Sequence, residues 1–373
     1  METKIKLGVV GFGRRGRALC GLATQSFPVE AAAICDSDEA NLGAAKQSYP
    51  EAALFSKFDR MLDEVKLDAI LVETPATFHA ELCSRALARD IHVMSDVPAV
   101  ATMAEAQELW RAQQSSRAFY MLGANPNMWG FVDAAVDLVK QGKLGKPYYM
   151  EAEYIHDVRS LFEITPWRQT YESIRYCTHS LGPLLRLIDE DLEWVSCFDT
   201  GSHINQQDGQ HDAMVAIFRS RSNVVVRLLT SFINNYPACG HGYRVYGTKG
   251  YFERQPGCEG LGPAKTLYYS TECHEKKALH EIPGGETPKE SGEKIADGHG
   301  GADYALLQRF FTAIRDGLPS PISLREGLRM TLPGIAAVES ARLGGQLVRI
   351  RYPWSDPTVE ATNESNKVIR PAP

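Results

Sequence analysis

Three glycines and one carboxylate near the start of the chain have the types and spacing needed to hold a phosphate-bearing ligand. Gly11, Gly13 and Gly16 fall at GxGxxG spacing, and Asp36 stands 20 positions after the last of them. Glycines here permit a tight turn and a close approach of backbone to a pyrophosphate, and the N-terminus of a following helix attracts anions. A carboxylate at this distance accepts hydrogen bonds from ribose hydroxyls and repels a 2′-phosphate. The pattern predicts a dinucleotide site that prefers NAD, with a glycine-rich structural turn as the alternative.

The elements that must position these residues alternate between strand and helix. The apolar runs Ile5 to Val10, Val29 to Cys35, Ala69 to Val72 and His92 to Met94 are separated by helical stretches. This order predicts a doubly wound parallel sheet, whose ligands bind at the carboxyl ends of its strands. The segments at these ends and in the glycine turn supply the other candidate cofactor contacts, which are Phe12, Arg14, Arg15, Thr74, Pro75, His79, Asp96, Val97 and Pro98. For Asp96, a helix cap before Pro98 is the alternative.

The pattern changes after about Asn125, where long and often alternating strands replace the short apolar runs. Such strands suit a large, mostly antiparallel sheet with one buried face. We therefore predict an α/β protein with a Rossmann domain over 1–125 and an α+β domain with a large open sheet over 126–355. The helix near 324–343 is a candidate to pack back on the first domain. Pro283 to Gly301 is expected to be a surface loop, and 356–373 a polar tail.

Composition excludes several classes of function. The chain has 373 residues and a net charge of −6, without a long basic run, which argues against nucleic acid and anionic membranes as partners. No stretch is apolar and long enough to span a bilayer, and no apolar signal region precedes the first strand. The eight cysteines form no CxxC motif. We expect a cytoplasmic protein without structural zinc.

The chain resembles the Gfo/Idh/MocA oxidoreductases along most of its length. The resemblance rests on the glycine turn and Asp36, Thr74-Pro75 with His79, Asp96-Val97-Pro98, His179, and Gly247-Thr248-Lys249-Gly250. It implies hydride transfer between a nicotinamide and a sugar or polyol hydroxyl. Two positions depart from the family: Val97 stands where a lysine is usual, and Arg175 stands four residues before His179, where an aspartate is common. The usual acid–base partners of a simple sugar dehydrogenase are thus missing.

One segment is similar to a narrower branch of that family, the NAD-dependent α-N-acetylgalactosaminidases. Residues 175–183 read Arg-Tyr-Cys-Thr-His-Ser-Leu-Gly-Pro, which resembles the Tyr-Pro-Thr-His-Gly-Leu-Gly-Pro of that branch; Cys177 and Ser180 differ from it. The branch also carries Glu-Val-Pro, and the segments 154–157 and 298–303 resemble it further. The resemblance implies cleavage of a glycosidic bond by transient oxidation at sugar C3, deprotonation at C2, elimination, addition of water and re-reduction.

The same resemblance implies roles for individual side chains. Tyr176 is the candidate base for the C2 proton, and His179 is the candidate for handling the proton of the C3 hydroxyl. Their i, i+3 spacing predicts a shared helix face, although such a pair more often lies on a helix face without any catalytic role. The candidate substrate contacts are Asn125, His156, Asp157, Trp167, Arg168, Arg175, His241 and His299. The structural alternatives are that His156 and Asp157 form a turn, that Trp167 belongs to the core, and that His241 and His299 are solvated loop residues.

Three functions remain open at this point. The first hypothesis is a glycosidase that acts through transient oxidation. The second is an NAD-dependent sugar or inositol dehydrogenase, and the third is a non-catalytic dinucleotide-sensing protein. The expected ligands are NAD and a small carbohydrate. No metal is expected, because the histidines lie on separate elements without HxxxH or HxH spacing. We further expect a homo-oligomer formed through the large sheet of the second domain.

Overall fold

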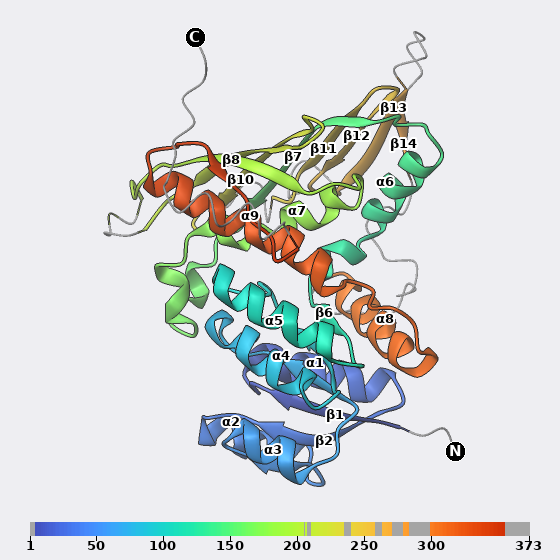
Figure 1. Ribbon diagram of the computed structural model, residues 1–373, viewed down its shortest axis with the longest axis vertical. Coiled ribbons are helices and arrows are strands. Elements are labelled where there is room, and N and C mark those ends of the chain that lie inside the picture. Colours follow the sequence, from blue (N-terminus) through green and yellow to red (C-terminus); the bar gives the residue numbers. More distant parts are fainter. Residues whose placement is uncertain are drawn as a thin grey trace. The chain divides into compact units, whose positions relative to one another are not determined.

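The computed structural model divides into two compact units (Figure 1). It describes residues 4–204, 206, 210–234, 240–257, 263–270, 279–282 and 299–354. Unit 1 comprises Met1–Met128 and Pro288–Leu328, and unit 2 comprises Trp129–Thr287 and Arg329–Pro373. The expected tail and most of the expected loop, residues 283–298, lie outside the described residues.

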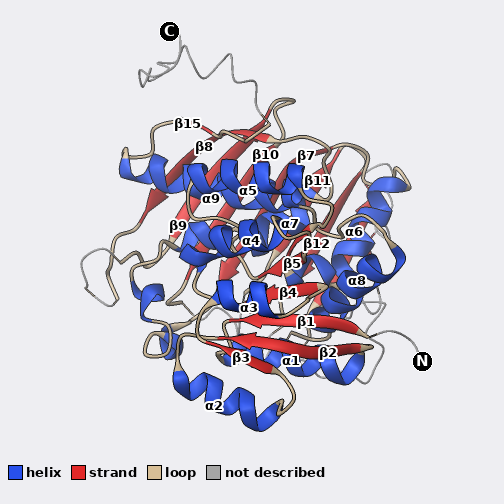
Figure 2. Cartoon of the chain, turned by 60° about the horizontal axis from the view of Figure 1, so that its bottom comes forward, coloured by secondary structure: helices blue, strands red, loops and turns tan. Residues whose placement is uncertain are grey.

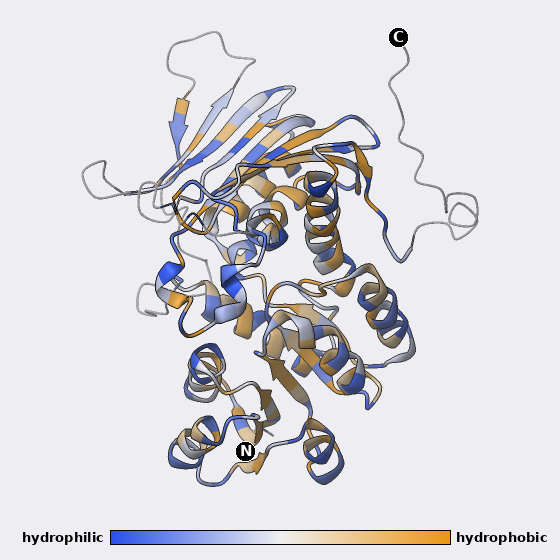
Figure 3. Ribbon diagram, turned by 90° about the vertical axis from the view of Figure 1, so that its left-hand side faces the viewer, coloured by the Kyte–Doolittle hydropathy of each residue, from blue (hydrophilic) through white to orange (hydrophobic). Residues whose placement is uncertain are grey.

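Unit 1 contains a parallel sheet of six strands in the order β3-β2-β1-β4-β5-β6 (Figure 2). The strand order reverses direction between β1 and β4, as the doubly wound prediction requires. All four residues of β4 are buried, and Figure 3 shows the strands of this unit in apolar colours, as expected for parallel strands covered on both faces. The strands are β1 (Ile5–Val10), β2 (Val29–Cys35), β3 (Ala53–Phe55), β4 (Ala69–Val72), β5 (His92–Ser95) and β6 (Tyr120–Leu122).

The helices of unit 1 begin and end at recognisable signals. Asp38 and Thr102 cap α2 and α5 by accepting hydrogen bonds from the backbone N–H groups of Ala40 and Glu105. The helices are α1 (Arg14–Ser26), α2 (Glu39–Ser48), α3 (Phe58–Glu64), α4 (His79–Leu87), α5 (Met103–Ser115) and α8 (Ala302–Asp316), with 3₁₀ turns η1 (Ala76–Phe78) and η2 (Asn125–Met128).

Unit 2 contains a sheet of nine strands in the order β14-β13-β12-β11-β7-β10-β9-β8-β15. All of its strand pairs are antiparallel except β7 with β10, which confirms the large, mostly antiparallel sheet. Val226, Leu228 and Thr230 of β10 are buried and alternate with half-buried residues, so one face of the sheet forms the core. The strands are β7 (Pro147–Ile155), β8 (Leu192–Asp199), β9 (Met214–Ser220), β10 (Val225–Ser231), β11 (Tyr243–Gly247), β12 (Gly250–Gln255), β13 (Lys265–Ser270), β14 (Leu279–Glu281) and β15 (Val348–Arg349).

Helices and short 3₁₀ turns complete unit 2. Helix α7 packs on β7, and the Ser340 hydroxyl of α9 accepts a hydrogen bond from the backbone of Cys197 in β8. The helices are α6 (Gly130–Lys140), α7 (Thr178–Leu185) and α9 (Leu324–Arg342), whose first residues belong to unit 1; the 3₁₀ turns are η3 (Arg159–Leu161), η4 (Pro166–Gln169) and η5 (Ser173–Tyr176). Among the described residues, no helix has the length and apolar character needed to cross a membrane.

Candidate functional site

The glycine turn after β1 has the backbone and the free space that a pyrophosphate needs. Gly11 has a φ of +86°, and a Cβ atom there would lie 2.6 Å from the carbonyl oxygen of Glu73. A Cβ atom on Gly16 would lie 2.0 Å from the carbonyl oxygen of Gly11, so α1 packs directly on the turn. A Cβ atom on Gly13 would meet no atom of the described residues within 4 Å. Because α1 has no acidic residue in its first turn, its N-terminus fits an anionic group of this kind.

The carboxylate of Asp36 is fixed at the end of β2, beside this turn. Its Oδ2 accepts hydrogen bonds from the backbone N–H of Phe12 (2.6 Å) and from the amide of Asn41 (3.1 Å). Its Oδ1 accepts a hydrogen bond from the backbone N–H of Asp38 (2.8 Å). These bonds hold the carboxylate in one orientation next to the glycine turn, which is the position from which the ribose of a dinucleotide is recognised.

Replacing Asp36 with alanine is expected to weaken NAD binding by about ten- to a hundredfold, which corresponds to the free energy of one charge-assisted hydrogen bond. The ratio of the affinities for NAD and NADP should also become smaller. The reason is that both the ribose acceptor and the charge that repels a 2′-phosphate disappear. Dissociation constants for both dinucleotides, measured by calorimetry, test this. Asp38→Ala is the control, because it removes only the cap of α2 and should leave the preference intact. Equal binding of NAD and NADP by the unmodified protein would contradict the prediction.

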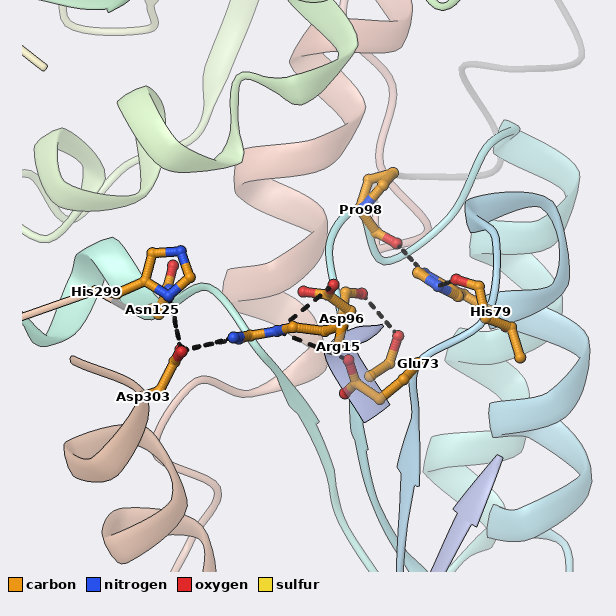
Figure 4. Close-up of polar contacts among 10 residues, drawn as sticks. Arg15, Glu73, His79, Asp96, Pro98, Asn125, His299 and Asp303 are labelled. Atoms are coloured by element: carbon orange, nitrogen blue, oxygen red, sulfur yellow. Dashed lines mark hydrogen bonds and ion pairs between the residues drawn. The ribbon is translucent and has the colours of Figure 1, made fainter. Parts of the chain in front are cut away.

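An ion-pair network extends from the glycine turn to the start of α8 (Figure 4). Both terminal nitrogens of Arg15 donate to Asp303, at 2.6 and 2.8 Å. Nδ1 of His299 lies 2.7 Å from the same carboxylate, and the amide of Asn125 donates to it at 3.0 Å. Burial alone would raise the pKa of Asp303, but the hydrogen bonds from Arg15 and His299 outweigh it and hold the pKa far below its ordinary value. The structure thus places two predicted substrate contacts, Asn125 and His299, around a carboxylate of unit 1.

Buried His79 links the turns that follow β4 and β5. Its side chain is 1% exposed, with Nδ1 2.8 Å from the carbonyl oxygen of Pro98 and Nε2 2.7 Å from that of Thr74. These contacts involve backbone on both sides of the ring. His79 therefore shapes the edge of the sheet at which Thr74, Pro75 and Pro98 lie, and is itself buried away from solvent.

Asp96 and Val97 follow β5 at the same edge of the sheet. Asp96 Oδ2 lies 4.0 Å from Nε of Arg15, and Val97 is 5% exposed. The alternative interpretation of Asp96 as a helix cap is wrong, because α5 begins only at Met103 and is capped by Thr102. The buried valine places an apolar side chain where the family usually has a lysine.

In unit 2, an aromatic and imidazole cluster surrounds Tyr154, near the end of β7. The ring centroid of Tyr154 lies 5.4 Å from that of Tyr176, 5.5 Å from that of His179 and 4.9 Å from that of His241. Its hydroxyl is 3.2 Å from Nδ1 of His156. The structure therefore brings four predicted site residues together around a tyrosine that was not predicted. The available signal was its position two residues before His156, in a segment that resembles the glycosidase branch.

Tyr176 and His179 are adjacent, but they do not share one helix. Tyr176 is the last residue of η5, and α7 begins at Thr178. Cys177 joins the two elements and itself has a helical conformation (φ −64°, ψ −10°), so the helical path of the backbone continues from η5 into α7. The two ring centroids lie 4.6 Å apart. The prediction of a shared α-helical face is thus corrected, while the pairing of the two rings is observed.

The remaining predicted residues of unit 2 have different partners: one packs on aromatic rings, and others form ion pairs with neighbouring charged residues. The guanidinium of Arg168 lies 4.5 Å from the ring centroid of Trp167 and 5.7 Å from that of Tyr176. Nε of Arg175 instead donates to Glu172, at 2.9 Å.

Asp157 forms an ion pair with Arg159 (2.6 Å). The hydrogen bond from Arg159 lowers the pKa of Asp157, so this carboxylate stays ionised and paired at neutral pH. No group of three or more metal-ligating side chains occurs within the ranges that the structure describes.

A doubly wound parallel sheet with a GxGxxG turn and a fixed carboxylate after β2 defines a dinucleotide-binding domain of the Rossmann type. The family model described as "Oxidoreductase family, NAD-binding Rossmann fold" matches residues 5–124, and its companion, "Oxidoreductase family, C-terminal alpha/beta domain", matches residues 136–349. The chain belongs to the Gfo/Idh/MocA oxidoreductase family, and its cofactor is NAD.

The chain is similar to curated proteins named as glycosyl hydrolases and, in its fold, to a solved dehydrogenase structure. The chain is 23% identical to a Glycosyl hydrolase family 109 protein of Bacteroides fragilis over 84% of this chain and 78% of the relative. It is 25% identical to one from Saccharopolyspora erythraea over 91% of this chain and 81% of the relative. Among solved structures, the WlbA dehydrogenase of Bordetella pertussis, in complex with NADH and UDP-GlcNAcA, superposes with a TM-score of 0.77 at 18% identity, over 94% of this chain and 99% of that chain. At that identity the superposition establishes a common fold.

Proposed function

We propose that this protein cleaves the glycosidic bond of a small carbohydrate, using bound NAD for a transient oxidation. The observation that carries the proposal is the pair of Tyr176 and His179, whose rings lie 4.6 Å apart within the cluster around Tyr154. Val97 supports it, because the lysine usual in simple dehydrogenases of the family is replaced by a side chain that cannot exchange protons. The relatives named Glycosyl hydrolase family 109 support it as well.

Two residues of the cluster, Tyr176 and His179, have definite tasks in this chemistry. His179 takes the proton of the C3 hydroxyl as the sugar is oxidised, and returns it at the end. The phenolic oxygen of Tyr176 takes the proton from C2, which the C3 ketone has made acidic. The electron pair forms a double bond between C1 and C2 as the bond from C1 to the leaving group breaks. The leaving group departs as an alcohol, with the proton taken from C2 balancing its charge, and water then adds across the double bond, giving its hydroxyl to C1 and a proton to C2. NAD supplies the hydride acceptor and donor for C3.

Arg168 and Trp167 support this division of tasks. The guanidinium of Arg168 lies against the ring of Tyr176 and carries a permanent positive charge, which favours the phenolate that proton abstraction requires. Trp167 offers an aromatic face beside it, of the kind that packs on the apolar side of a sugar ring. We infer that the substrate binds with its C2 and C3 edge toward the Tyr176–His179 pair.

An aryl glycoside assay without added oxidant distinguishes the candidate functions. We expect release of the aryl alcohol with no net change in NAD, because oxidation and re-reduction cancel. Stoichiometric reduction of NAD with the glycosidic bond intact would instead show a sugar dehydrogenase. Binding of NAD without turnover of any glycoside or free sugar would show a dinucleotide sensor.

A further inference from the structure

Glu73 is a buried acid to which the sugar chemistry assigns no task. It follows β4 directly, and its side chain is 1% exposed. Within the described part of the chain, neither carboxyl oxygen has a hydrogen-bond partner, and Nε of Arg15 lies 3.9 Å from Oε2. An ionised carboxylate is costly in such surroundings unless hydrogen bonds or a counter-ion compensate it.

Arg15 is not available as a full counter-ion for Glu73. It is already bound by Asp303 through two hydrogen bonds, and Asp96 lies 4.0 Å from its Nε, so three carboxyl groups surround one guanidinium (Figure 4). Burial raises the pKa of Glu73 well above its ordinary value; Asp96 and Asp303 raise it further, and Arg15 only partly opposes them. The thiol of Cys83 on α4 also interacts with this acid, and burial raises the pKa of the thiol, which keeps it neutral.

Glu73 also lies directly against the turn that would hold the pyrophosphate. A Cβ atom on Gly11 would meet its carbonyl oxygen at 2.6 Å, and a Cβ atom on Gly16 would lie 3.5 Å from its Cβ. A bound pyrophosphate adds negative charge next to this acid and so penalises its ionised form. By the reciprocity of linked equilibria, a neutral Glu73 must then favour the dinucleotide. His299, which is hydrogen-bonded to Asp303, is a further titratable group of the network.

We propose that Glu73 carries a proton in the dinucleotide complex, and that this proton and the dinucleotide stabilise each other's binding. Glu73 is a positioning residue, because its buried oxygens act on the charge balance around Arg15 and the glycine turn rather than on the reacting sugar. The proposal applies equally to a hydrolase and to a dehydrogenase, since it concerns cofactor binding alone.

Infrared difference spectroscopy on the full chain, with and without NAD, tests the proton directly. The difference between the unmodified protein and Glu73→Gln should show the carbonyl stretch of one protonated carboxylic acid at about pH 7, well above the ordinary pKa of glutamate. With NAD bound, this band should persist to higher pH than without NAD. Glu64→Gln is the matched control, because Glu64 is an exposed glutamate on α3 and should show no such band.

Calorimetry tests the coupling. Above the pH at which the band is lost, Glu73→Gln should bind NAD about tenfold more tightly than the unmodified protein. The proposal is overturned if the band is missing in the complex, if NAD leaves its pH range unchanged, or if Glu73→Gln binds NAD more weakly at every pH. If Glu73→Gln fails to fold, Asp96→Asn gives a second test. Removing this neighbouring charge must lower the pH at which the carboxylic acid band disappears. The proposal is overturned if the band of Asp96→Asn disappears at the same pH as that of the unmodified protein.

Discussion

Replacing Tyr176 with phenylalanine is expected to abolish glycoside cleavage while leaving NAD binding nearly unchanged. The ring and its contacts with Tyr154 and His179 are kept, and only the hydroxyl that would accept the C2 proton is lost. Removing a general base costs about 10²- to 10⁴-fold in rate. The measurement is turnover of an aryl glycoside together with the incorporation of deuterium at C2 of the product in deuterated water.

Both readouts should fall together in Tyr176→Phe. Tyr246→Phe is the matched control, because Tyr246 packs against Tyr149 and Tyr251 in the sheet, outside the cluster around Tyr154. A Tyr176→Phe protein that cleaves glycosides at a near-normal rate would show that another group is the base. An unmodified protein that exchanges no C2 proton on any glycoside, yet oxidises free sugars, would establish the dehydrogenase instead.

Substitution of Gly16 by alanine is expected to damage both the stability of unit 1 and its binding of NAD. A Cβ atom there would lie 2.0 Å from the carbonyl oxygen of Gly11, which is backbone and cannot rotate away. The start of α1 must shift, at a cost of about 1–3 kcal/mol in the free energy of unfolding. Since the same shift moves the N–H groups that face the pyrophosphate, the dissociation constant of NAD should rise by about tenfold or more. Thermal unfolding and calorimetry measure the two effects.

Two other glycines separate packing from cofactor binding. A Cβ atom on Gly13 meets no atom within 4 Å in the part of the chain that the structure describes, so Gly13→Ala should leave stability unchanged and weaken NAD binding by occupying the space left for the pyrophosphate. Gly43 on α2 also has open space around it among the described residues. Gly43→Ala should leave NAD binding unchanged and change the free energy of unfolding by no more than about 1 kcal/mol. Full NAD affinity in Gly13→Ala would show that the pyrophosphate does not lie over this turn.

The local signals of the sequence were sufficient for the fold class and for the cofactor. A strand such as Ala69–Val72 reads as an uninterrupted apolar run because a parallel strand is buried on both faces. The glycine turn is equally local, because Gly11 and Gly16 touch within a single turn of chain. The helix boundary between Tyr176 and His179 was missed, since a one-residue joint at Cys177 leaves no trace in residue spacing.

Tertiary structure alone decided which charges and rings meet. Arg15 binds Asp303, 288 positions away, and Tyr154 gathers His179 and His241 from different elements. Nothing in the types or spacing of these residues encodes such partners, because spacing reports contacts only within a helix, a strand or a turn. The same holds for Glu73: its sequence position at the end of a strand was readable, but its lack of a hydrogen-bond partner among the described residues depends on where Arg15 and Asp96 lie once the sheet has formed. Burial and electrostatic pairing are properties of the folded chain, and they determine which carboxyl groups carry charge.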